Sequence, residues 1–344
     1  MSSVTHLPIQ SAGLLYPPLG PPTAGFVPLE KDDDILKSYG LPPRPEKEIF
    51  PQKYAQWERL MSQSLSFVAP GYVSTTAEIP DPPVSAEMHD PIPPARGSNR
   101  RWSGAASNLL KCGDKFNHIQ ASWTVPRVYP TPDKWKSATT WDNDPSRYLC
   151  GIWVGIDGWR TSHDVLQAGT GMRCEVDKDG ILSHETFAWF EWFPEDKKVL
   201  TNFKVEAGDV ITVMVDYLGT DPEDAETHVG RAVFVNESNS TYTSFQYNYK
   251  AKSERHKFKG DTAEWILEGH GRRIFPNFGA TFMYNCLAST MKGDERDLAY
   301  PKMIDMAQAR NQMATPIKVT ENIMGIYWGN GKSSAHLVDA LKTT

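Results

Sequence analysis

From about Asn99 onward, the chain consists of short runs in which apolar and polar residues alternate. Residues 211–217 form one such run, with isoleucine, valine, valine and tyrosine at every second position. This period of two is the period of a β-strand, because successive strand side chains point to opposite faces. Gly, Pro, Asn and Asp separate the runs and favour turns. Many short strands joined by turns are typical of an all-β sandwich or barrel.

Three further runs support this class and differ in pattern. Residues 229–235 are apolar at almost every position, which suits a strand buried on both faces. Residues 243–249 alternate with aromatics, and residues 321–328 form the last apolar run that reads as a strand.

The first hundred residues have a different composition. Most of the 26 prolines lie there, often in pairs, and this predicts extended chain rather than a packed domain. An island within Gln52–Val68 differs, because apolar residues recur there at helical spacing: Tyr54, Trp57, Met61, Leu65 and Val68. We expect this short helix to pack against the downstream domain. The extension is then either a pro-region that covers the cleft or an N-terminal addition without that role.

The predicted organisation has three parts. Residues 1–100 form the proline-rich extension, residues 101–330 the β-domain, and residues 331–344 a short C-terminal helix that Ser333 or Ser334 can cap. The net charge of −6 is spread evenly, so no basic patch suggests nucleic-acid binding. Because no apolar run approaches about 18 residues, we expect no membrane-spanning helix.

Four cysteines occur in the chain: Cys112, Cys150, Cys174 and Cys286. Their spacing lacks a Cys-x-x-Cys pair, so neither a zinc site nor another metal site is expected. Buried thiols acting as small hydrophobic groups are favoured over two disulfides. We therefore predict no metal and no cofactor. The sequons at Asn236 and Asn239 matter only if the chain enters the secretory pathway.

Two stretches about a hundred residues apart each place one polar side chain in an apolar, strand-like run. Gln167 follows the first, Trp153–Gly158, and Glu264 lies within the second, Thr262–Glu268. If the two side chains converge across a sheet, the carboxylate can activate a water molecule. The amide can donate a hydrogen bond to the oxyanion that forms. The pair would then make a compact site for amide hydrolysis.

These stretches belong to an ordered series of motifs that resembles the glutamic peptidases, also called eqolisins. The motifs run in order through Trp102–Ala105, Ser122–Pro126, Trp153–Gly158, Trp189–Pro194, Glu206–Asp209, Ala263–Ile266 and Phe278–Phe282. The resemblance covers about Trp102 to Trp328. It implies a concanavalin-like β-sandwich of two antiparallel sheets. It also implies a pepstatin-insensitive endopeptidase that favours acid, acts as a monomer on polypeptides and needs no cofactor.

The resemblance also assigns roles to residues. Glu264 is expected to act as general base and then general acid, while Gln167 holds the water and stabilises the oxyanion. A hydrogen bond from Gln167 is expected to favour the ionised form of Glu264. Supporting or substrate-binding roles follow for Trp153, Asp157, Trp189 and Glu191. Two alternatives stay open here: Trp153 as a core residue, and Glu191 as a purely structural acceptor.

The chain departs from the family pattern at several points. Ala168 follows the glutamine where a polar residue is usual, Thr170 and Gly171 stand where an acid is common, and Phe193 replaces a tyrosine. The sequence as given begins without a secretory signal, although the family is typically secreted, so the compartment is not assigned.

Three other functions stay open, and the departures favour the first of them. The first is an intracellular pseudo-peptidase with weak activity. The second is a carbohydrate-binding module that uses exposed tryptophans such as Trp153, Trp189 and Trp192 as a stacking platform. The third is a glycosidase in which Glu191 and Glu264 form a carboxyl pair whose separation sets the stereochemistry.

Overall fold

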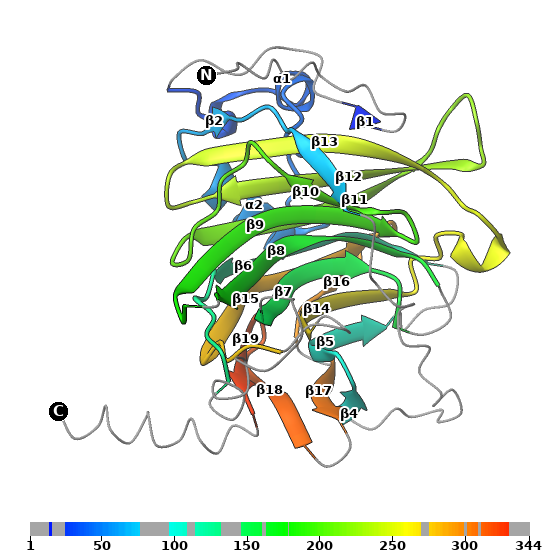
Figure 1. The fold of residues 1–344 in the computed structure, drawn as a ribbon. Coiled ribbons are helices and arrows are strands. Elements are labelled where there is room, and N and C mark those ends of the chain that lie inside the picture. Colours follow the sequence, from blue (N-terminus) through cyan, green and yellow to red (C-terminus); the bar gives the residue numbers. More distant parts are fainter. Residues whose placement is uncertain are drawn as a thin grey trace.

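The computed structural model describes residues 14–15, 25–75, 96–108, 114–131, 146–159, 163–177, 179–269, 275–298, 301–308 and 311–329. The C-terminal helix predicted at 331–344 and the thiol of Cys112 lie outside these residues. Strands dominate the described chain, as the period-two runs predict (Figure 1).

The strands form two layers. In the first layer the hydrogen-bonded order is β3 (Tyr72–Thr75), β10 (Lys197–Leu200), β9 (Leu182–Phe193), β8 (Val165–Val176), β7 (Ser146–Ile156), β14 (Thr262–Gly269), β5 (Trp102–Asn108) and β17 (Lys302–Gln308). In the second the order is β18 (Asn311–Thr320), β19 (Ile323–Trp328), β15 (Ala280–Thr290), β6 (Phe116–Thr124), β11 (Val210–Thr220), β12 (Thr227–Asn236) and β13 (Thr241–Lys250).

Short strands complete these layers at their edges. β4 (Arg96–Asn99) pairs with β17, β16 (Glu295–Arg296) with β15, and both β1 (Leu14–Leu15) and β2 (Ser66–Phe67) with β13. Within the described chain only the β4–β17 and β2–β13 pairings are parallel. Hydrogen bonds between β17 and β18 join the layers, so the sandwich is one continuous sheet folded onto itself.

The main core lies between the two layers. Phe190 of β9 and Phe245 of β13 meet across it with ring centroids 4.4 Å apart. Trp265 of β14 donates its indole N–H to a backbone carbonyl of β6 over 2.9 Å, so a buried polar group is satisfied by the opposite layer. Each large side chain buried here contributes roughly 1.5–3 kcal/mol of hydrophobic stabilisation. The predicted all-β sandwich is confirmed.

The individual strand predictions are also confirmed. The run 211–217 lies in β11, 243–249 in β13, and 321–328 overlaps β19. The apolar run 229–235 lies in β12, where Phe234 faces the main core and Val233 faces the opposite side. Both faces of β12 are buried because the N-terminal extension covers the outer face of the second layer.

That extension contains η1 (Pro28–Glu30), α1 (Asp33–Ser38), α2 (Pro51–Met61), β2 and β3. A second apolar cluster joins it to β11, β12 and β13, with Trp57 and Met61 at most 3% exposed. The extension therefore packs on the downstream domain, as the helical stripe predicts, although the helix ends at Met61 (Figure 1). A short 3-10 helix, η3 (Glu254–His256), precedes β14 elsewhere in the chain.

The described cysteines match the prediction of buried, unbridged thiols. Cys150, Cys174 and Cys286 are free and lie in the main core, and burial raises the pKa of each thiol. The first sequon is closed to modification, because Asn236 is fully buried and its amide donates to Asp209 over 2.7 Å.

Candidate active site

The register of four adjacent strands in the first layer places the two predicted catalytic side chains in one row. Glu264 of β14 pairs with Gly155 of β7, Gly155 pairs with Gln167 of β8, and Gln167 pairs with Glu191 of β9. Residues directly opposite one another project to the same face of a sheet. Because neighbouring strands lie about 4.8 Å apart, the backbones of Glu264 and Gln167 are about 10 Å apart with only a glycine between them.

Gly155 keeps the space between these side chains clear. A Cβ atom at this position would lie 3.1 Å from the Cβ of Gln167 and 3.0 Å from the ring of Trp153. Both contacts are tighter than normal packing allows. Because Gly155 has no side chain, the space between the long side chains of Glu264 and Gln167 is left open.

The Glu264 carboxyl is enclosed by the protein. It is 0% exposed, and neither oxygen has a hydrogen-bond partner of normal geometry. Burial raises its pKa well above the ordinary value; the Thr262 hydroxyl opposes the shift, and the charges of Asp157 and Asp164 add to it. A buried carboxyl without a partner is stable only in its neutral form or when another molecule binds it. Glu264 therefore keeps its proton to a higher pH than an ordinary glutamate.

The amide of Gln167 hydrogen-bonds Glu191 and not Glu264. Its Nε2 donates to Oε2 of Glu191 over 2.7 Å, while its Oε1 is buried without a partner. The expectation that Gln167 hydrogen-bonds Glu264 and favours its ionised form is therefore wrong for this state. Glu191 is one strand away and Glu264 is two, so the nearer carboxyl takes the amide. The pKa of Glu264 rises instead of falling.

Glu191 is fully enclosed on the same face. Burial raises its pKa to about 7; Lys197 lowers it and Glu268 raises it, and the Gln167 hydrogen bond lowers it. Its second oxygen, Oε1, has no partner. Glu191 thus anchors one N–H of the Gln167 amide and leaves the other N–H free to point elsewhere.

Tryptophans form the apolar floor of this face. The next row of the sheet contains Trp153 on β7 and Trp189 on β9, both paired with Gly169 of β8. Trp153 donates its indole N–H to Glu268 over 2.9 Å, and the ammonium of Lys197 lies 3.9 Å from the ring centroid of Trp189. Both indoles are at most 2% exposed, so they support the site from within an apolar cluster.

Asp157 holds a loop instead of lining the row. Strand β7 ends at Ile156, and Asp157 adopts a left-handed φ of 71°. Its carboxylate accepts three backbone N–H groups, each over 2.8 Å, from the loop 259–261 that precedes β14. Burial raises its pKa to about 6, against the lowering effect of these three bonds. The idea that Asp157 shares the face of Gly155 fails because the strand has already ended.

Glu268 and Lys197 also border this face, and neither is among the site residues expected from the sequence. The period of two places Glu268 on the same face as Glu264, four residues away on β14, so this signal was present in the sequence. Lys197 lies on β10, and only the pairing of β10 with β9 brings it beside Trp189. In the described part of the chain, no three His, Cys, Asp or Glu side chains cluster as metal ligands would.

Comparison with known proteins identifies the family. A profile of the Peptidase A4 family matches residues 100–327. The chain belongs to this family. It is a peptidase of the glutamic type, a hydrolase whose substrate is a polypeptide. Its described helices are too short or too polar to cross a membrane.

Individual relatives are distant. Aspergillopepsin-2 of Aspergillus niger is 25% identical over 211 residues, which span 56% of this chain and 67% of the relative. The crystal structure of scytalido-glutamic peptidase with a transition state analog inhibitor has a TM-score of 0.50 and 19% identity, covering 67% of this chain and 98% of its own. The crystal structure of aspergilloglutamic peptidase from Aspergillus niger has a TM-score of 0.42 at 22% identity, covering 53% and 99%. At these identities the first structure indicates the shared fold.

Proposed function

We propose that this peptidase is an endopeptidase whose catalytic dyad is Gln167 and Glu264. The observation that supports the proposal is the single row of Glu264, Gly155, Gln167 and Glu191 across four strands. The row combines one carboxyl that can accept and return a proton with one amide that can donate hydrogen bonds. Gly155, which has no side chain, lies between them.

In the proposed reaction, ionised Glu264 takes a proton from a water molecule as that water attacks the carbonyl carbon of the scissile bond. The free N–H of Gln167 stabilises the developing oxyanion, which commonly contributes about 3–4 kcal/mol to the transition state. Neutral Glu264 then returns the proton to the amine nitrogen, and the C–N bond breaks. Glu191 holds the other N–H of Gln167 and so fixes the plane of the amide.

The pH dependence follows from Glu264. A general base works only when ionised, so activity should rise as pH increases through the pKa of Glu264. Because burial raises that pKa above its ordinary value, we propose that activity rises at a higher pH than the ionisation of an ordinary glutamate would give. The reacting pair is one carboxyl and one amide. An inhibitor such as pepstatin, directed at paired aspartates, should therefore not block it.

A sugar-stacking platform receives no support from the site. The three tryptophans that could form it, Trp153, Trp189 and Trp192, are at most 2% exposed. A ring that stacks on a sugar must present its face to the ligand. The substrate is a polypeptide, as the family implies, and we propose that a single copy of the chain carries the complete site.

The test is digestion of an unfolded protein between about pH 2 and pH 7 in the presence of pepstatin. Wild type is compared with Glu264→Gln, Gln167→Ala and the exposed control Glu185→Gln, after circular dichroism shows that all are folded. Loss of cleavage in the first two variants alone supports the dyad. Undiminished cleavage by either, or no cleavage by wild type, overturns the proposal.

A further inference from the structure

The outer face of the second layer carries an unusual row of polar side chains. Ser289 of β15 pairs with His118 of β6, His118 with Asp216 of β11, and Asp216 with Arg231 of β12. All four are less than 9% exposed. His118 Nδ1 lies 2.8 Å from Asp216, which also accepts two hydrogen bonds from Arg231. Charges of this kind are normally solvated on an outer face, so here the face is covered.

Helix α2 forms part of the cover, and a side chain of the sandwich caps its N-terminus. Its N-cap residue, Phe50, makes no side-chain capping bond. Instead, the carboxylate of Glu295 on β16 accepts the backbone N–H groups of Gln52 and Lys53, over 3.0 and 2.7 Å. A carboxylate at this end of a helix satisfies free N–H groups and favours the helix dipole. The helix therefore depends on docking for its cap.

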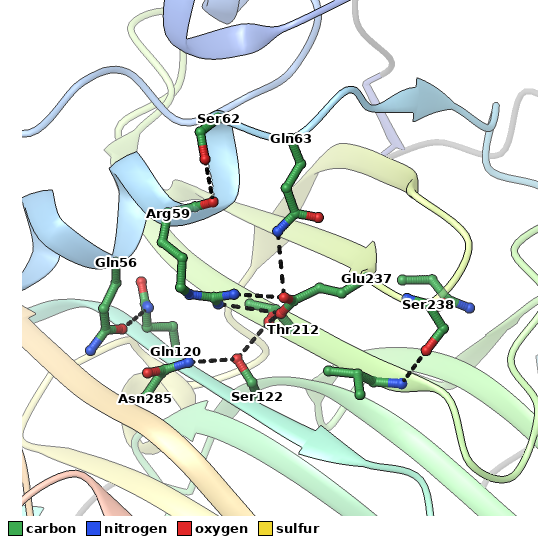
Figure 2. Close-up of polar contacts among 12 residues, drawn as sticks. Gln56, Arg59, Ser62, Gln63, Gln120, Ser122, Thr212, Glu237, Ser238 and Asn285 are labelled. Atoms are coloured by element: carbon green, nitrogen blue, oxygen red, sulfur yellow. Dashed lines mark hydrogen bonds and ion pairs between the residues drawn. The ribbon is translucent and has the colours of Figure 1, made fainter.

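Polar contacts join the body of the helix to the same face. Arg59 binds Glu237 through an ion pair of 2.6 Å, and Gln63 donates to the same carboxylate (Figure 2). Gln120 of β6 donates to Gln56, as Figure 2 also shows. The Lys53 ammonium lies 3.4 Å from the Ser289 hydroxyl, at one end of the buried row.

Apolar contacts surround this polar centre. The extension contributes Phe26, Leu36, Leu41, Trp57, Leu60, Met61 and Leu65, and the sandwich contributes Met214, Val233, Val235 and Tyr242. Beyond the helix, β2 adds to β13 and β3 adds to β10 as further strands. The contact thus has an apolar core, specific polar pairs and strand additions, which are the parts of a stable protein–protein interface.

We propose that residues 25–75 act as a separable subunit docked on this face, which stays bound when the chain between Thr75 and Trp102 is cut and dissociates in acid. Its helices and β2 lie against the outer face of the second layer, away from Glu264 and Gln167. Only its last strand, β3, reaches the first layer, where it adds to β10 at the edge. A cut between Thr75 and Trp102 would accordingly leave a two-chain protein.

The acid dependence follows from the groups buried at the contact. The charged or titratable side chains that face it are Lys53, Arg59, His118, Asp216, Arg231, Glu237, Tyr284 and Glu295.

Two of these side chains determine whether docking becomes stronger or weaker as pH falls. Burial and the Lys53 charge lower the pKa of His118, against the effect of Asp216. For Glu237 burial raises the pKa, but hydrogen bonds from Arg59 and Thr212 outweigh it and leave the pKa lowered. A group whose pKa is lowered by docking binds its proton more readily in the free state. The docking contribution of His118 is therefore lost as pH falls below the ordinary histidine value, and that of Glu237 is lost further into acid.

The experiment inserts a recognition sequence for a site-specific protease between Thr75 and Arg96 of the full chain. The protein is cut at about pH 7.5 and analysed by size-exclusion chromatography at that pH and at about pH 4. We expect the two pieces to elute together at the higher pH and apart at the lower, while the uncut chain stays folded at both. Separation at the higher pH overturns the proposal, and so does co-elution at both.

Variants of the cut protein test the named contacts. Arg59→Met should weaken association at the higher pH at least tenfold, whereas Arg173→Met, which removes an ion pair with Glu185 on another hairpin, should not. His118→Gln removes the titrating group, so separation should require a lower pH than in wild type. Equal effects of the two arginine variants, or an unchanged separation pH in His118→Gln, contradict the role given to these contacts.

Discussion

Gln167→Glu offers a direct test of how the amide and Glu191 are arranged. The substitution replaces an N–H donor, 2.7 Å from Glu191, with an oxygen. Two ionised carboxylates at that separation would repel by about 6 kcal/mol at an effective dielectric constant of 20. Since about 1.36 kcal/mol corresponds to one pKa unit, the pair should retain one proton until roughly four units above the ordinary glutamate value.

The sign of the stability change follows from that proton. The pair in the folded variant has a pKa raised above that of the unfolded chain, so its stability is fully present below the unfolded value and declines as pH rises. Gln167→Glu should unfold near the wild-type temperature at about pH 4. At about pH 8 it should lose several kcal/mol, at no more than about 1.4 kcal/mol per pH unit. Thermal and denaturant unfolding across this range measure the difference.

A double variant provides the control. Gln167→Glu combined with Glu191→Gln restores one amide and one carboxyl to the same row, so stability at the higher pH should recover. Activity should not recover, because the amide donor is now on β9 and no longer at position 167 on β8. Loss of an oxyanion donor from its position commonly lowers kcat by about 10²–10³. Equal destabilisation of Gln167→Glu at both pH values would refute the electrostatic reasoning and indicate a packing defect.

Three further substitutions test the rest of the site. Gly155→Val should lower stability and also lower kcat/KM at least tenfold, because its side chain presses on Trp153 and Gln167 and fills the space above β7; unchanged kinetics would contradict that geometry. Asp157→Asn should lose about 1–3 kcal/mol of stability at acid pH, because it weakens three hydrogen bonds. Wild type should lose stability as pH rises from the ordinary aspartate pKa to about 6, and the variant, which has no carboxyl to ionise, should not show this decrease. Lys197→Met should raise the pKa of Glu191 further and move the pH–activity profile upward, whereas an unmoved profile would show that the Glu191 charge is irrelevant to the Gln167 amide.

Local patterns in the sequence were sufficient to locate several of the central strands. The run 211–217 alternates with a period of two because one face of β11 meets the main core, and this requirement is written into every second residue. The continuous apolar run in β12 likewise predicts burial on both faces. The helix in the extension was predicted from its stripe, but its end at Met61 was not, because Leu65 is buried through contacts outside the helix.

The candidate site was only partly accessible from the sequence. Gln167 and Glu264 were named from ordered motifs, since each is a polar residue in an apolar strand. Their shared row was not, because register depends on hydrogen bonds between strands distant in sequence. That register also makes Glu191 the partner of Gln167. Glu264 therefore lacks the hydrogen bond that was expected to favour its ionised form, and burial raises its pKa.

By itself, then, the sequence determined the all-β class, the position of several central strands and the two residues that we propose as the dyad, because those features are encoded in local periodicity and motif order. The tertiary structure alone decided which carboxyl the amide binds, that Asp157 anchors a loop, and that the extension docks behind the site. These depend on distances between residues far apart in the chain, and on burial that no single segment can specify.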